Sequence, residues 1–187
     1  DSEQWWKVGD IVSEIRVDTV KNRAGTSTIT TADITNAPAF LAKLSANQTL
    51  TDATDTKVQF DTEVFDTDGK YDHTTNYRFT PTVAGTYLFY LQTHGLSNAN
   101  AEVGDIILSL KKNGNHLYSA RGNYQNNRPN QVTHNLTVTD VANSTDYYEA
   151  FMYFDDQSGN GDVDAMIGGA FNNTVPSFFG AHKLIGL

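Results

Sequence analysis

The segment at residues 155–164, DDQSGNGDVD, carries alternating oxygen-bearing side chains of the kind that bind a hard cation. Gly161 directly follows Asn160, as glycine does in the first half of a calcium-binding loop. The twelfth position of such a loop needs a bidentate glutamate, but it is Ile167 here, and no helical pattern flanks the segment. Calcium is therefore one hypothesis for this loop, and a solvated turn is the other. The ligands would be Asp156, Ser158, Asn160, Asp162 and Asp164.

Two amide-rich segments have the composition of a binding loop. HGLSNANAEVGD and RGNYQNNRPNQ are rich in Asn and Gln, whose amides pair with hydroxyl-rich ligands. An aromatic ring among them could stack on a sugar or dock in a pocket. We predict receptor contacts from Arg121, Tyr124 and Arg128, and the plainer interpretation is that such loops only form turns.

The chain lacks the sequence motifs of common catalytic sites. It has no cysteine, no Gly-x-Ser-x-Gly, no His-Glu-x-x-His and no phosphate-binding loop. Its five histidines lack metal-ligand spacing, although a three-fold axis could bring copies of His94, His134 or His182 together. Carboxylates such as Glu63 and Asp66 could serve a glycosidase, but acidic residues are common throughout. We predict a non-enzymatic protein with no cofactor beyond the calcium considered above.

Composition limits the partners. The 187 residues carry a formal net charge of -9 at pH 7, whereas a phosphate-binding face needs clustered Lys and Arg. No run approaches the about eighteen apolar residues of a membrane span, and the first residues do not resemble a signal peptide. We therefore predict no nucleic-acid binding and no membrane insertion.

Short segments rich in Val, Ile, Thr, Tyr and Phe, separated by Gly, Asn and Asp, predict an all-β fold. Asn113-Gly114 is the clearest hairpin signal among the turns. Nine strands at this spacing suit a two-sheet sandwich. They are expected at residues 40–45, 57–60, 77–80, 86–94, 106–112, 116–122, 132–139, 147–154 and 177–187.

Two of these strands are apolar on both faces. Tyr87, Phe89 and Leu91 would share one face of the fourth strand, and Leu88 and Tyr90 would lie on the other. A monomeric sandwich leaves one face of each strand in water, so the second face needs a cover. We predict another copy of the chain there, and the alternative is a long loop or the N-terminal arm. The predicted subunit contacts are Leu88, Tyr90, Phe178, Phe179, Leu184 and Ile185.

Four segments resemble the globular head domain of complement component 1q, which belongs with the tumour necrosis factor superfamily. They are PAFLAKLSANQTL, KVQFDTEVFDTDGKYDHTTNYRFTPTVAGTYLFYLQ, LSLKKNGN and PSFFGAHKLIGL. The matching positions include Phe79-Thr80-Pro81, Gly85, Tyr87 and Phe89 in the central segment and Phe179-Gly180 near the end. The resemblance implies a ten-stranded jelly roll that assembles as a homotrimer with its inner sheets buried around a three-fold axis.

The N-terminal part differs from the rest. Its segment VKNRAGTSTITTADITNAP is Thr-rich with few large apolar groups, so alone it could not bury enough surface to offset its ordering entropy. The segment before it, WWKVGDIVSEIRVDTV, contains two adjacent Trp and could form a strand or a short helix. VKNRAGTSTITTADIT resembles the stem segments that precede such heads in bacteriophage tail fibres. We therefore expect a stem or arm at 1–37 and a jelly-roll head at 38–187.

These resemblances imply a trimeric receptor-binding or adhesion tip of a bacteriophage tail fibre, which binds a glycan or protein on the host cell surface. The location would be the virion, or otherwise extracellular. A structural virion decoration or head fibre is the first alternative, and a secreted complement-like recognition module is the second. Three binding sites per trimer would compensate for a weak single site.

Overall fold

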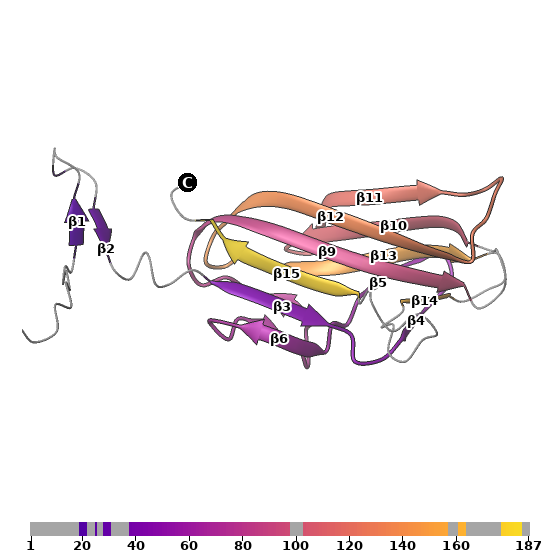
Figure 1. The fold of residues 1–187 in the computed structure, drawn as a ribbon, viewed down its shortest axis with the longest axis horizontal. Helices are drawn as coiled ribbons and strands as arrows, with labels where there is room; N and C mark the ends of the chain where they lie inside the picture. The colour runs from indigo at the N-terminus through magenta and orange to yellow at the C-terminus, as the bar shows by residue number, and fades with distance from the viewer. Residues whose placement is uncertain are drawn as a thin grey trace, which may run out of the picture. The chain divides into compact units, whose positions relative to one another are not determined.

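The computed structural model describes residues 19–21, 25, 28–30, 38–97, 103–156, 161–163 and 177–184. Contacts divide the chain into two units, Asp1–Asn36 and Ala37–Leu187. In the first unit, strand β1 (Thr19–Lys21) pairs antiparallel with β2 (Thr28–Thr30). The second unit, the head, consists of two antiparallel sheets in two layers (Figure 1).

We name each sheet of the head after its central long strand. The β10 sheet has the order β11 (Asn115–Asn123), β10 (Val103–Lys112), β13 (Tyr148–Asp156), β8 (Arg78–Phe79) and β7 (Tyr71–Asp72), and β5 (Thr54–Lys57) also pairs with β13. The β9 sheet has the order β4 (Gln48–Leu50), β14 (Gly161–Val163), β9 (Gly85–Ser97), β15 (Phe178–Lys183), β3 (Ala39–Lys43) and β6 (Thr62–Asp66), and β12 (Gln131–Ala142) also pairs with β9.

An aromatic core fills the space between the two sheets. Phe40 stacks on Tyr71 and Phe79 with ring centroids 4.6 Å apart in both pairs. Phe89 of the β9 sheet meets Tyr148 of the β10 sheet at 4.3 Å. These side chains are buried, so one chain supplies a complete core of its own.

The all-β jelly-roll prediction is confirmed. The two sheets contain six and seven strands, more than the ten expected, because segments of only two or three residues such as β4, β7, β8 and β14 count among them. The expected strand at 57–60 is wrong, since β5 ends at Lys57. β5 has the polar sequence TDTK and forms through backbone pairing with β13. A polar segment has no apolar alternation from which a strand could be predicted. The described residues contain no helix, so none of them offers a helical membrane span.

The predicted hairpin at Asn113-Gly114 is confirmed. Both residues have positive φ, 52° and 80°, as a primed two-residue turn requires. The turn joins β10 to β11 and places Lys112 opposite Asn115. The Asn113 side chain donates to Asp146 Oδ1 at 2.8 Å and accepts from the Tyr147 N–H at 2.9 Å, which fixes the turn against the start of β13.

Candidate functional site

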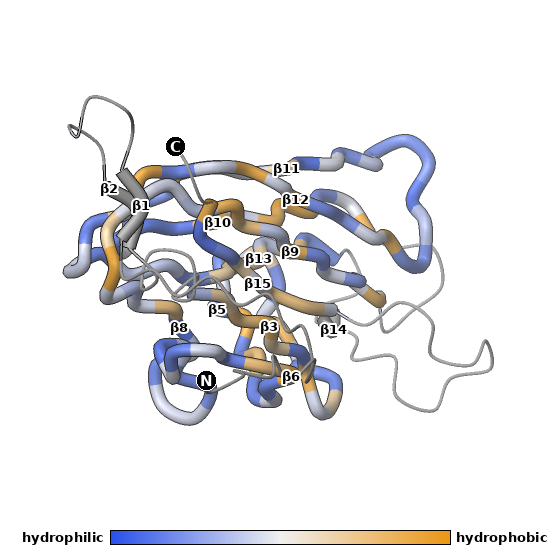
Figure 2. The backbone as a smooth tube through the Cα atoms, turned by 60° about the vertical axis from the view of Figure 1, so that its left-hand side comes forward, coloured by the Kyte–Doolittle hydropathy of each residue, from blue (hydrophilic) through white to orange (hydrophobic). Residues whose placement is uncertain are grey.

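The first candidate surface lies on the side of the β9 sheet that faces away from the core. Tyr87, Phe89 and Leu91 of β9 are buried in the core, whereas Leu88 and Tyr90 point outward and are half-buried. Their neighbours on β15 and β3 continue an apolar surface, and the hydrophobic colouring along these strands is visible in Figure 2. We call this surface the aromatic face, and it consists of Leu41, Leu88, Tyr90, Phe178 and His182.

Tyr90 lies flat at the centre of the aromatic face because its cross-strand neighbour is a glycine. Gly180 is opposite Tyr90 in the ladder, and a Cβ added there would lie within 2.7 Å of two ring carbons and the hydroxyl oxygen of Tyr90. The Tyr90 hydroxyl donates to the Phe40 carbonyl oxygen at 3.3 Å. The ring is 6.3 Å from Phe178 and 5.9 Å from His182, measured between centroids. Burial of the side chain raises the pKa of Tyr90.

The sequence prediction for this surface needs one correction. Phe179 is fully buried inside the chain, where its ring meets Phe40 at 4.9 Å, so its place is the core. Neighbouring residues of a strand point to opposite sides, and Phe178 alone of this pair faces outward. Leu184 is half-buried and its N–H donates to the Thr86 carbonyl oxygen at 2.8 Å. Ile185 lies outside the described residues.

The three histidines considered for a shared metal site separate into two groups. His182 lies on the aromatic face, and His94 is buried on the same side of β9, with its ring nitrogens 2.8 Å from Thr133 Oγ1 and 2.9 Å from Gln131 Oε1. His134 instead lies beside Gly122, and desolvation lowers its pKa. Within the described part of the chain, no three His, Cys, Asp or Glu side chains are grouped for a metal ion.

The acidic segment is only partly described. Asp156 is the last residue of β13 and its side chain is buried, while its N–H donates to Asp52 Oδ1 at 2.8 Å. Asp162 lies on β14, whose backbone pairs with β4 and β9. Ser158, Asn160 and Asp164 lie outside the described residues. A calcium site at this segment stays a prediction.

The three predicted receptor-binding residues differ in exposure, and receptor binding through them stays a prediction. Arg121 is exposed on β11 and makes a bidentate ion pair with Asp105, one arm of which, Nε to Oδ1, measures 3.0 Å. This ion pair raises the pKa of Arg121. Tyr124 is half-buried and packs against the core and Gly122. Arg128 is also half-buried.

The second candidate surface is the outward side of the β10 sheet, where charged side chains lie in pairs over aromatic rings. Lys57 Nζ is 2.5 Å from Glu149 Oε1, and Lys111 Nζ is 2.6 Å from Asp55 Oδ2. The Lys111 ammonium also lies 3.7 Å from the centroid of the Phe151 ring. Sequence reasoning missed this surface because these residues come from three strands, β5, β10 and β13, that are far apart in the chain.

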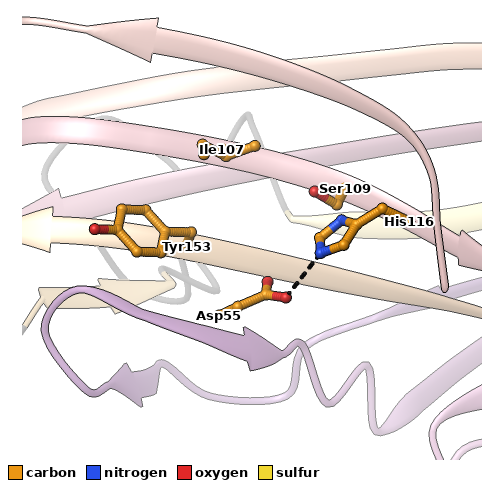
Figure 3. A pocket seen from close by; sticks show the side chains of 5 residues that line it. All are labelled: Asp55, Ile107, Ser109, His116 and Tyr153. Atoms are coloured by element: carbon orange, nitrogen blue, oxygen red, sulfur yellow. Dashed lines mark ion pairs between the residues drawn. The ribbon is translucent and has the colours of Figure 1, made fainter. Parts of the chain in front are cut away.

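A recess of about 140 Å³ opens within this second surface (Figure 3). Tyr153 and His116 lie on opposite sides of it, with Asp55 between them. His116 Nε2 is 3.2 Å from Asp55 Oδ2. The remaining lining comes from Ile107 and Ser109 of β10.

Ser109, His116 and Asp55 are the residue types of a hydrolytic triad, but their arrangement differs from one. No hydrogen bond joins Ser109 to His116 among the described side chains, so the serine has no base. Ser109 is only 1% exposed and lies within β10, where strands pair on both sides and leave no pair of N–H groups for an oxyanion. The recess therefore fits binding better than catalysis.

The fold defines the class of protein as a jelly-roll head with two antiparallel sheets, and sequence comparison identifies the family. A profile of the C1q domain matches residues 39–160. The chain therefore belongs to the C1q domain family, whose globular domains are often recognition modules.

The chain is similar to the globular domain of zebrafish complement 1qA protein, with 15% sequence identity and a TM-score of 0.47. The alignment covers 78% of this chain and 94% of that one. None of the curated proteins compared with the chain matches it.

Proposed function

We propose that this chain is a non-enzymatic recognition head that works as a homotrimer, in which the aromatic faces of three copies meet. The observation that carries the proposal is the aromatic face itself. Four of its five side chains are aliphatic or aromatic and the fifth is His182; all five are half-buried in one chain and are contiguous across β9, β15 and β3. A second copy would remove this surface from water, which stabilises association in proportion to the apolar area buried.

The proposed setting is the receptor-binding tip of a bacteriophage tail fibre that attaches to a glycan or protein of the host surface. The Thr-rich N-terminal segment, with its resemblance to fibre stems, supports this setting. Membership of the C1q domain family supports recognition in general and is compatible with an extracellular or virion location.

Binding to intact cells tests this function. We expect the fluorescently labelled full chain to bind one or a few strains in a panel of bacteria, with occupancy that depends on three linked sites. The control is the same protein with Tyr90→Asp, which should bind far more weakly because it loses avidity. Binding to no cell would contradict recognition and favour a structural decoration. Binding to animal surfaces and to no bacterium would favour the secreted complement-like module.

A further inference from the structure

We propose that the recess between Asp55, His116 and Tyr153 binds a single neutral sugar unit of a surface glycan. This inference rests on the recognition function proposed above and assigns it a site. Each copy of the chain carries this recess. It lies on the β10 sheet, on the side of the head opposite the aromatic face. Assembly through the aromatic face would therefore leave it open to a ligand.

The size of the recess limits the ligand to one ring-sized group. At about 140 Å³ it is smaller than the pockets of roughly 300–1,000 Å³ that enclose drug-sized ligands. It lies on an outward sheet surface, so a chain of further units could continue from the bound ring into solvent. That geometry suits the terminal or a side-branch unit of an oligosaccharide.

The lining groups fit a polyol. The Tyr153 ring offers an apolar face for the C–H side of a sugar, and it stands across from the imidazole of His116. His116 and Asp55 can pair with neighbouring hydroxyl groups, because an imidazole and a carboxylate both form hydrogen bonds with O–H groups. Ile107 provides an apolar patch beside them.

Asp55 has an acceptor that the protein itself does not satisfy. Its Oδ2 pairs with Lys111 and His116, whereas its Oδ1 is buried and receives no hydrogen bond from any residue in the described part of the chain. A buried acceptor without a donor is costly, and such an atom calls for an explanation. A ligand hydroxyl that donates to Oδ1 would supply the missing partner, and the two residues stay partly open to solvent, with His116 58% and Asp55 31% exposed.

The charges around the recess favour a neutral ligand. Lys111 forms an ion pair with Asp55 of the recess, and Arg121 forms one with Asp105 on the same surface. A third pair, Lys57 with Glu149, lies close by. Each of these three pairs combines one positive and one negative side chain, and the net charge of -9 opposes acidic glycans.

The test is a glycan array that carries neutral, sialylated and sulfated oligosaccharides, followed by saturation-transfer NMR with the methyl glycoside of the best unit. We expect neutral glycans to bind. Tyr153→Ala should weaken binding at least about tenfold through loss of the stacking surface, and Tyr153→Phe should keep most of it. Tyr118→Ala is the matched control, because Tyr118 is an exposed tyrosine of the same sheet outside the recess.

Asp55→Asn is the second variant, since it keeps the shape of the side chain and changes its hydrogen bonding. We expect it to weaken binding as well, in a protein whose circular dichroism is unchanged. Selectivity for acidic glycans, or affinity that neither variant changes, would overturn the recess as a sugar site. If Tyr153→Ala still binds whole cells, the recess is not the sugar site, and the proposed recognition function is unaffected. If the wild-type chain binds no cell, the proposed recognition function itself is contradicted.

Discussion

Gly180 is the residue on which the aromatic face depends most directly. A methyl group at this position would overlap the ring of Tyr90, which lies on the sheet across from it. We expect Gly180→Ala to displace the ring and lower the free energy of unfolding by about 1–3 kcal/mol. Urea denaturation measures this loss.

The double variant Gly180→Ala, Tyr90→Ala distinguishes the ring contact from a backbone effect. With the ring removed, the added methyl group has nothing to overlap. The double variant should therefore lose much less unfolding free energy than the sum of the losses in the two single variants. Additive losses would show that Gly180 is needed for another reason.

Asp146 provides a residue-level prediction of pH dependence. Its carboxylate accepts from the Asn143 N–H and the Asn113 amide, each at 2.8 Å, and lies 3.1 Å from Lys112 Nζ. These partners lower its pKa below the ordinary 3.8, with the backbone bond from Asn143 as the largest cause. The stabilisation is therefore present above pH 3.8 and is lost as the pH falls through the lowered folded-state pKa.

Asp146→Asn should cost about 1–3 kcal/mol at pH 7, because the amide places a donor against Lys112 and the Asn143 N–H. The difference in unfolding free energy between the variant and the wild type should become smaller as the pH falls below 3.8. Chemical denaturation at pH 7 and at pH 3 measures both values. A difference that is the same at both pH values would contradict the role of the ionised carboxylate.

At the scale of elements, alternate residues of β9 serve two purposes: one face of the strand packs in the core, and the other is proposed to contact further copies of the chain. Phe89 faces the core and Tyr90 faces outward. We expect Phe89→Ala to lower the free energy of unfolding by about 3–5 kcal/mol. Tyr90→Ala should leave the fold of a single chain intact and weaken assembly, so thermal unfolding and sedimentation would respond to different substitutions. Equal effects of both on unfolding at low protein concentration would contradict this division.

The long strands and their two faces could be predicted because apolar residues alternate regularly along them. β9 and the Asn113-Gly114 turn are examples, since their residue types allow few other conformations. β5 could not be predicted in the same way, because it is polar and depends on pairing with β13.

The candidate sites were harder to predict than the strands. Phe179 was expected on the subunit surface, and only the observed pleat shows that it belongs to the core. The recess could not be predicted, since Asp55 and His116 are sixty-one positions apart and meet through strand pairing. A single sequence contains the residues of such a site but not their register.

For the whole molecule, the two proposed functions belong to opposite surfaces of one head. The aromatic face would hold three copies together, and the β10 sheet would carry a recess outward on each copy. This arrangement multiplies a weak site by three without further contacts. It also makes assembly and recognition separable by mutation, because no residue of the aromatic face lines the recess.

The most direct test of the account is the mass of the chain in solution, measured by multi-angle light scattering for the wild type, Tyr90→Asp and the control Tyr118→Asp. We expect three times the 20.6 kDa of one chain for the wild type and the control, and a single-chain mass for Tyr90→Asp. A wild type that is a single chain, or a Tyr90→Asp variant that keeps the wild-type mass, would contradict assembly through the aromatic face.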